Sequence, residues 1–224
     1  MLRVNDIFES ISGEAGGFPQ GTWTTFIRLQ GCNLLCSWPC DTPRAQDVHA
    51  LCYEMEIPSI LKMIRNKHVL ITGGEPLIQN ETLYLIKELQ RCGHTVQVET
   101  NGSLNLHPLK DVHWVVDRKG PSSGMSKWML TPETLSDQVK GIQQAGGHVY
   151  FKWVVGNDED IDYMLADMEK FLYGNGTVIP FIISPVDAKG GMITDIVEKV
   201  WEKNSMFLDN IIFSVQLHKI FNMA

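Results

Sequence analysis

Three of the five cysteines in this 224-residue chain lie close together, as Cys32, Cys36 and Cys40, with the spacing C-x3-C-x3-C. They directly follow a run from Trp23 to Leu29 whose alternating pattern is typical of a β-strand. A loop that leaves a strand can bring three thiolates to one side, and such soft ligands suit an iron–sulfur cluster or, less well, a zinc ion. A structural zinc normally has four protein ligands. Three cysteines on a four-iron cluster would leave one iron free to bind another ligand.

A second candidate site is the segment 72–76, Thr-Gly-Gly-Glu-Pro, which follows a predicted buried strand at 68–72. Glycines at a strand end let the backbone approach a ligand closely because they carry no Cβ. The Glu75 carboxylate can accept a hydrogen bond from an ammonium group. A Gly-Gly turn alone is weak evidence for a site, but together with the cysteines upstream it indicates one that holds a ligand.

The rest of the chain alternates between predicted strands and helices. Periodicity predicts further strands at 95–99, 112–117, 149–155, 178–183 and 211–216. It predicts helices over 57–64, after a cap at Asn80, after Thr131 with Pro132 at the first helical position, and at 158–173 and 193–201. Residues 43–55 look irregular, and the glycine-rich, acidic segment 7–17 is by itself typical of a surface turn.

Strands that alternate with helices indicate an α/β fold, with a parallel sheet and helical crossovers. In such folds the functional residues collect on loops at the carboxyl ends of the strands. Six predicted strands are followed by polar or glycine-bearing loops, which are the cysteine loop and the segments 73–76, 99–102, 117–119, 184–187 and 216–219. No change in composition marks a linker, so we expect one domain over residues 1–224.

The composition excludes several classes of protein. A net charge of -7 argues against non-specific binding to nucleic acid. The chain has no apolar run of membrane-spanning length, and its N-terminus lacks the pattern of a signal peptide. Five cysteines, with three crowded together, are not typical of a disulfide framework. We therefore expect a cytoplasmic protein with reduced thiols, without a nucleic-acid or membrane partner.

Several segments together resemble the radical SAM (S-adenosylmethionine) superfamily and, within it, the 7-carboxy-7-deazaguanine synthase (QueE) family. The resemblance to the superfamily rests on the cysteine loop, Asp41-Thr42 and the Gly-Gly-Glu-Pro motif. The narrower resemblance extends over most of the chain and rests on the segments 12–14, 26–32, 40–42, 71–76, 99–102 and 216–219. It implies a partial (β/α) TIM-like barrel with mostly parallel strands, which is the radical SAM core.

The implied activity is the conversion of 6-carboxy-5,6,7,8-tetrahydropterin to 7-carboxy-7-deazaguanine with loss of ammonia, in the biosynthesis of deazapurines of the preQ0 and queuosine type. The implied cofactors are a [4Fe-4S] cluster, SAM and Mg²⁺. An electron from the cluster would cleave SAM, and the 5′-deoxyadenosyl radical would remove the hydrogen at C6 of the substrate and later return one. The implied partners are the pterin substrate, a flavodoxin-like or other electron donor, and a second copy of the chain in a homodimer.

The resemblance also assigns roles to individual residues. It places Cys32, Cys36 and Cys40 on the cluster and Thr42 on Mg²⁺. The residues implied for SAM are Gly74, Glu75, Asp117, Arg118, Lys119, Ser184, Pro185, Val186 and Asp187. Those implied for the substrate are Ile11, Ser12, Gly13, Glu14, Arg28, Thr72, His218 and the terminal carboxylate of Ala224. The chain departs from the usual motifs in having Ser12 for glutamine, Ala15 for glycine and Asp117-Arg118 for Ser-Pro, and C-x3-C-x3-C in place of C-x3-C-x2-C.

Two other functions are open on the sequence alone. Another small radical SAM enzyme, such as a glycyl-radical-enzyme activase, would need a large protein partner, whereas the segment from His218 to Ala224 favours the synthase. An electron-transfer or structural module that carries a cluster or zinc would not be an enzyme. It would need a fourth protein ligand, and no fourth cysteine lies in the cysteine loop.

Overall fold

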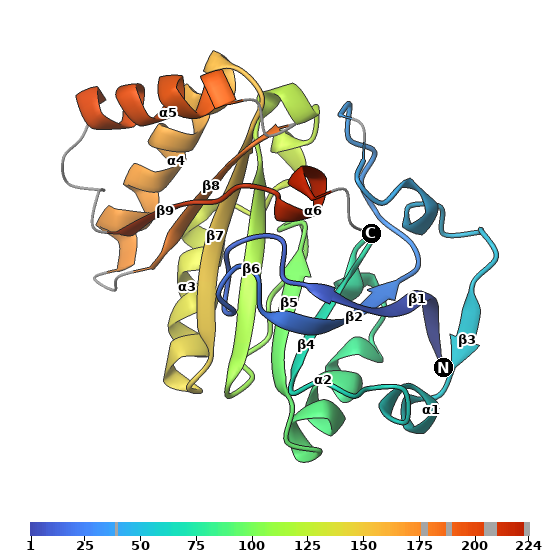
Figure 1. Cartoon of the computed structure of the whole chain (residues 1–224). Helices are drawn as coiled ribbons and strands as arrows, with labels where there is room; N and C mark the ends of the chain where they lie inside the picture. Colours follow the sequence, from blue (N-terminus) through green and yellow to red (C-terminus); the bar gives the residue numbers. More distant parts are fainter. Residues whose placement is uncertain (39, 176–178, 187–189, 204–209, 222–224) are drawn as a thin grey trace.

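The computed structural model describes residues 1–38, 40–175, 179–186, 190–203 and 210–221. They form one nine-stranded sheet in the order β3-β1-β2-β4-β5-β6-β7-β8-β9 (Figure 1). The strands are β1 (Leu2–Ile11), β2 (Trp23–Leu29), β3 (Tyr53–Met55), β4 (His68–Gly73), β5 (Thr95–Thr100), β6 (Val112–Lys119), β7 (His148–Val155), β8 (Phe181–Pro185) and β9 (Ile211–Phe213). From β2 to β9 every neighbouring pair is parallel, whereas β1 is antiparallel to both β2 and β3.

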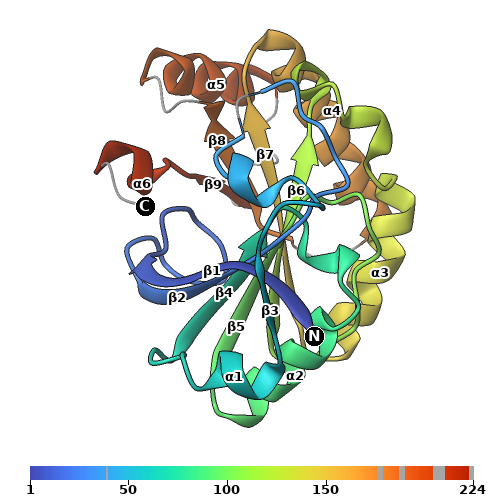
Figure 2. The ribbon, with the colours of Figure 1, turned by 90° about the vertical axis from the view of Figure 1, so that its right-hand side faces the viewer.

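The sheet curves without closing, which confirms a mostly parallel α/β fold of the partial-barrel kind. The edge strands β3 and β9 do not pair with each other. Instead, the loop between β1 and β2 contacts the chain after β9: the N–H of Leu217 donates to the Gly13 carbonyl at 2.9 Å, and the N–H of Ala15 to the Ser214 hydroxyl at 2.9 Å. Figure 2 shows this hairpin and α6 facing each other on the side away from α3.

Six α-helices are present among the described residues. They are α1 (Ile57–Leu61), α2 (Thr82–Arg91), α3 (Pro132–Gln144), α4 (Asp158–Asn175), α5 (Gly190–Lys203) and α6 (Leu217–Ile220). Helix α3 begins as predicted, because the Thr131 side chain accepts a hydrogen bond from the Thr134 N–H and proline follows at the first helical position. Helix α2 begins later than predicted, with Glu81 rather than Asn80 at the cap position. None of the described helices has both the length and the apolar character needed to cross a membrane.

The predicted surface turn at 7–17 is partly wrong, because residues 7–11 continue strand β1. Strand β1 lies near an edge of the sheet. It buries Leu2 and Val4, but its later positions border a cavity, so its sequence lacks a regular apolar pattern there. The last predicted strand is shorter than expected: β9 ends at Phe213, and Gln216 immediately precedes α6. The start of the predicted strand at 178–183 falls partly outside the described residues.

One large hydrophobic core joins the outer face of the sheet to helices α2 to α5, and it includes the buried side chains of Trp114, Phe151, Met164 and Phe171. This packing fixes the parallel strands, so that their carboxyl ends meet at one rim. The opposite, concave face of the sheet is less filled and carries the polar side chains described below.

Candidate active site

A cavity of about 430 Å³ lies on the concave face of the sheet, at the carboxyl ends of the strands. Side chains from the β1–β2 hairpin, the cysteine loop, β4, β5, β6, β7 and the segment before α6 line it. Most of these segments are the loops that the sequence predicts as functional. Its volume is within the usual range for a small-molecule site.

Cys32, Cys36 and Cys40 all line this cavity and are all free thiols. Backbone hydrogen bonds hold the loop in place, from the Cys32 N–H to the Gln46 carbonyl at 2.9 Å and from the Ser37 N–H to the Ser123 carbonyl at 2.8 Å. Burial raises the pKa of Cys32 and of Cys36 and so favours their protonated form. Binding of a metal requires the thiolate, so these thiols would release their protons when a metal binds.

The three thiols are not gathered around one position as the ligands of a single zinc ion would be. Among the described residues, no three His, Cys, Asp or Glu side chains converge on one position suitable for a metal ion. Thiolates on one tetrahedral zinc would lie about 3.8 Å apart, from the Zn–S length of about 2.3 Å. In a four-iron cluster each cysteine binds its own iron, so the three sulfur atoms are more widely spaced around one cavity wall.

Thr42 lies beside the third cysteine at the cavity edge. Its hydroxyl donates to the Gly73 carbonyl at 3.2 Å and lies 3.6 Å from the Cys40 sulfur. Gly73 has φ +144°, and a Cβ on it would overlap the Leu29 carbonyl oxygen. A Cβ on Gly74 would overlap the Gly31 carbonyl oxygen in the same way. The two glycines therefore let the end of β4 pack directly on the start of the cysteine loop, and both border the cavity.

The structure does not bring the Glu75 carboxylate into the cavity. Glu75 is fully buried and accepts three hydrogen bonds, from the Leu77 N–H at 2.9 Å, the Thr100 hydroxyl at 2.8 Å and the Asn101 N–H at 2.6 Å. Burial raises the pKa of Glu75 to about 7. The side chain predicted to contact SAM instead ties the end of β4 to the end of β5.

A chain of alternating charges crosses the concave face. Lys119 contacts Asp117 at 2.6 Å; Asp117 contacts Lys152 at 3.1 Å; and Lys152 contacts Glu14 at 2.5 Å. Gln216 extends the chain by donating to Glu14 at 2.8 Å and to Asp41 at 3.2 Å. Every residue in this chain borders the cavity. Two cations thus alternate with two carboxylates, and the site holds its charges without a large net excess.

Two further polar side chains point at the cavity with fewer protein partners. Arg28 has a buried Nε without a hydrogen-bond partner among the described residues, and its guanidinium carbon lies 4.8 Å from the centre of the Phe8 ring. Glu99 receives a long hydrogen bond of 3.4 Å from the Thr72 hydroxyl, and burial raises its pKa to about 7. Gln216 Oε1 likewise has no donor within the described ranges, so a polar ligand would satisfy this acceptor and the Arg28 donor.

The remaining sequence-predicted residues are only partly brought together. Ile11, Gly13 and Val186 line the cavity. Ser12 is buried behind it, with its hydroxyl 3.2 Å from the Glu14 carbonyl, and Ser184 and Pro185 are buried within β8. Asp187, Ala224 and the side chain of His218 lie outside the described residues.

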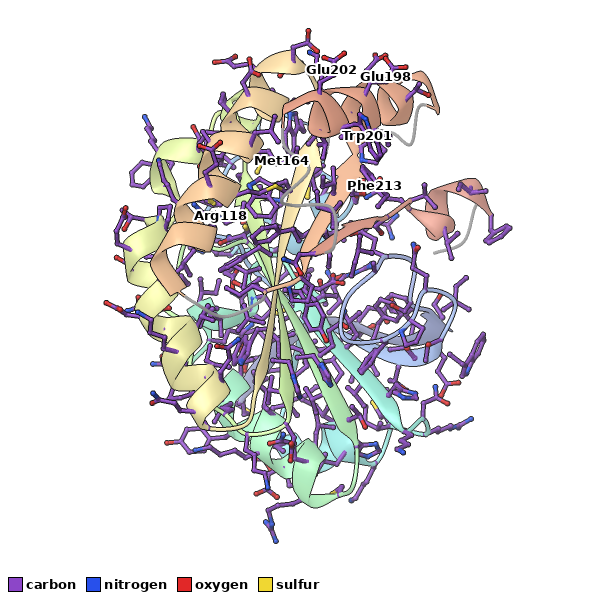
Figure 3. All side chains as sticks on the ribbon, turned by 90° about the vertical axis from the view of Figure 1, so that its left-hand side faces the viewer. Arg118, Met164, Glu198, Trp201, Glu202 and Phe213 are labelled. Carbon is purple, nitrogen blue, oxygen red and sulfur yellow. The ribbon has the colours of Figure 1, made fainter. Side chains whose placement is uncertain are left out.

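Arg118 is directed away from the cavity. It is 1% exposed and forms a two-pronged ion pair with Asp167 of α4, at 2.8 and 3.0 Å. Figure 3 shows Arg118 on the side of the sheet that the helices cover, where Met164 of α4 also lies. Its neighbours in β6, Asp117 and Lys119, face the cavity because successive side chains of a strand alternate between faces.

Several cavity residues receive no role from the sequence, and three of them are polar or charged: Lys152, Glu99 and Gln216. Glu99 and Gln216 belong to motifs that the sequence marks at strand ends, but without an assigned contact. The signal for Lys152 is a lysine in the middle of the apolar strand β7, since a buried lysine is rare unless it is paired. Phe8 and Phe26, whose rings stack at 5.0 Å, form an apolar wall of the same cavity.

The chain is similar to several proteins named 7-carboxy-7-deazaguanine synthase. It is 32% identical to the one from Clostridium acetobutylicum, over 97% of this chain and 95% of that protein. It is 34% identical to the one from Methanospirillum hungatei, over 83% of this chain and 73% of the relative. No model of a known protein family matches the chain.

Solved structures show the same fold. The crystal structure of QueE from Escherichia coli superposes with a TM-score of 0.67 at 22% identity, over 96% of this chain and 93% of that one. Streptococcus suis SuiB bound to S-adenosylmethionine superposes with a TM-score of 0.60 at 13% identity, over 83% of this chain and 48% of that one.

Proposed function

The chain belongs to the 7-carboxy-7-deazaguanine synthase family of radical SAM enzymes, and we propose that its cavity holds a reduced carboxypterin beside SAM and a [4Fe-4S] cluster. The reaction is the ring contraction of 6-carboxy-5,6,7,8-tetrahydropterin to 7-carboxy-7-deazaguanine with release of ammonia, in deazapurine biosynthesis. The names of the relatives favour this activity over that of a glycyl-radical-enzyme activase.

Cys32, Cys36 and Cys40 would hold three irons of the cluster, on the wall where all three thiols border the cavity. The cluster and SAM, when bound, supply a one-electron cleavage that yields a radical able to remove one hydrogen atom from the substrate. Gly74, Lys119 and Val186 border the same space and would contact SAM. The part of the protein is to place the reacting groups and to exclude water.

We assign the substrate to the region between Arg28 and Glu14. Arg28 offers a guanidinium whose Nε has no partner among the described residues, and this group suits the substrate's carboxylate. Glu14 and Gln216 Oε1, which has no donor among the described residues, are acceptors that suit the N–H groups of a pterin. Phe8 and Phe26 would contact the apolar face of the ring, and Thr72 and Glu99 its remaining edge.

Thr42 would contribute its hydroxyl to Mg²⁺, a hard cation that prefers oxygen ligands and retains several waters. The support is its position at the cavity edge, beside Cys40 and the Gly73 carbonyl. We further propose a homodimer that works in the reducing cytoplasm with a flavodoxin-like or other electron donor, in keeping with five free cysteines.

The observation that carries the proposal is the convergence on one cavity of three free thiols and a guanidinium nitrogen that has no hydrogen-bond partner in the described part of the chain. The test is anaerobic incubation of reconstituted protein with SAM, a reductant and 6-carboxy-tetrahydropterin. Ammonia and the deazapurine chromophore are the expected products. A Cys36→Ala variant serves as the control and should lose both the iron content and the activity. Turnover by that variant at the wild-type rate, or a reconstituted wild type that never consumes the pterin, would contradict the proposal.

A further inference from the structure

Lys152 lies at the centre of the concave face, in the middle of β7. It is 6% exposed, and its ammonium group contacts Glu14 Oε2 at 2.5 Å and Asp117 Oδ1 at 3.1 Å. A buried ammonium is costly unless it is paired, and here two carboxylates from other segments of the chain pair with it. Burial by itself would lower the pKa of Lys152, but Asp117, Glu14 and Glu99 raise it well above its usual value. Lys152 is therefore a permanent cation.

Both oxygens of Glu14 receive a donor. Oε2 contacts the Lys152 ammonium, and Oε1 accepts from the Gln216 amide at 2.8 Å. Burial alone would raise the pKa of Glu14, but Lys152 and Gln216 lower it overall. Each carboxylate oxygen can accept two hydrogen bonds, so each retains one lone pair for a ligand. Glu14 is thus an oriented, ionised acceptor at the cavity wall.

The other charged groups around Glu14 make its ionisation depend on Lys152. Asp117 faces it from β6 and Glu99 from β5, while Gln216, just before α6, joins it to Asp41 of the cysteine loop. Lys119 already pairs with the second oxygen of Asp117. Without Lys152, the carboxylates of Glu14, Asp117 and Glu99 would share one lysine, and like charges at close range favour protonation of one of them.

We propose that Lys152 is a positioning residue, which holds Glu14 as a fixed carboxylate so that this side of the cavity selects a ligand edge with N–H donors. The amino group and ring N–H of an aminopyrimidinone form such an edge, and a carboxylate can accept from both together. This inference rests on the proposed pterin site and deepens it. Lys152 does not touch the reacting atoms; it acts through Glu14.

The test measures equilibrium binding of 6-carboxy-tetrahydropterin by calorimetry to anaerobically reconstituted protein, with SAM and reductant omitted so that no turnover occurs. Lys152→Met should weaken binding by about thirtyfold or more, as for the loss of one partner of a buried charge pair. Lys152→Arg retains the cation and should recover most of the affinity. Lys140→Met, on the exposed side of α3, is the matched control and should bind as the wild type does.

A double-mutant cycle separates this role from a purely structural one. Adding Lys152→Met to Glu14→Gln should weaken binding by less than about threefold beyond Glu14→Gln alone, because the carboxylate that Lys152 positions is already gone. If Lys152→Met alone does not fold, the double variant is compared with Glu14→Gln, and a loss of more than about threefold between these two would overturn the inference. Equal losses in both backgrounds, or wild-type binding by Lys152→Met, would overturn the inference. A wild-type protein that binds no pterin would instead overturn the proposed function.

Discussion

The Glu75 carboxylate accepts a hydrogen bond of 2.6 Å from the main-chain N–H of Asn101, across the ends of β4 and β5. Asn101 in turn directs its side-chain amide toward the sulfur of Cys32 at 3.8 Å and toward Asn33 at 2.9 Å. Glu75 therefore supports the cysteine loop through Asn101. Glu75 belongs to the Gly-Gly-Glu-Pro motif that resembles a SAM contact, but its carboxylate joins the ends of β4 and β5.

We expect Glu75→Gln to lower stability more than it lowers affinity for SAM. The substitution replaces one acceptor oxygen by an NH₂ group that faces a donor, and an unsatisfied buried group costs about 1–3 kcal/mol. Urea unfolding measures the stability, and equilibrium dialysis with SAM measures the affinity. Glu88→Gln, on the surface of α2, is the control. A variant of wild-type stability that no longer binds SAM would show that Glu75 contacts the cofactor directly.

Glu99→Gln should stabilise the protein at high pH and reduce its activity. Burial raises the pKa of Glu99 to about 7, from about 4.5 in the unfolded chain. Between these pH values the folded protein binds one proton more than the unfolded chain, so its stability falls as the pH rises through this range. The variant has no such loss, so its gain in unfolding free energy over the wild type should grow from pH 4.5 to pH 7. The upper limit is about 3 kcal/mol, and solvent in the open cavity reduces the gain below it.

Urea unfolding of wild type and Glu99→Gln at pH 5 and pH 8 measures this difference. Turnover by the variant should fall because the group faces the substrate region. An advantage that does not change with pH would show that Glu99 ionises normally in the folded protein.

His113 should make the protein less stable in mild acid. Burial, and after it His148, lower the pKa of His113 to about 4, and the two rings stack at 4.8 Å. Between pH 6.5 and 4 the unfolded chain binds this proton and the folded chain does not, so stability falls as the pH falls through that window. His113→Phe keeps a planar ring next to Gly17, where any Cβ would overlap the residue-113 side chain, and should flatten the pH dependence of stability.

The measurement is the change in unfolding free energy between pH 7.5 and pH 5, compared for wild type and His113→Phe. Carboxylates contribute to both proteins alike, so the difference between the two changes isolates the histidine. Identical changes in the two proteins would contradict the prediction.

Trp38→Phe should weaken retention of the cluster without unfolding the protein. The Trp38 indole N–H donates to the Ser122 hydroxyl at 2.8 Å, and Ser122 donates through both its hydroxyl and its N–H to Asp160, near the start of α4. This relay anchors Trp38, which lies between Cys36 and Cys40 in the cysteine loop. Its loss costs about 1 kcal/mol, a typical net value for one hydrogen bond.

Iron content after anaerobic desalting, and the rate of bleaching in air, measure the effect for Trp38→Phe. Trp128→Phe is the control, since that indole is exposed and lies outside the cavity. Equal iron retention by the two variants would show that the relay does not support the loop.

Local pattern in the sequence determined most of the elements and their order. The alternation in β2 and β4 to β7, the Thr131 cap and the cysteine spacing are all properties of neighbouring residues, which a single sequence displays directly. Because the carboxyl ends of parallel strands meet at one rim of the sheet, the strand order alone also predicts which loops lie together. The family resemblance then supplied the chemistry, and the relatives bear it out.

Only the tertiary structure decided which side chains meet. Glu14 and Lys152 are 138 positions apart, and Glu14 and Gln216 are 202 apart, so no local pattern links them. Arg118 and Asp117 are adjacent, yet Arg118 packs against α4 and Asp117 lines the cavity. Successive side chains of a strand point to opposite faces of the sheet, and the two faces contact different parts of the protein. Periodicity specifies that faces alternate, but the packing of the helices against one side specifies which face becomes the site.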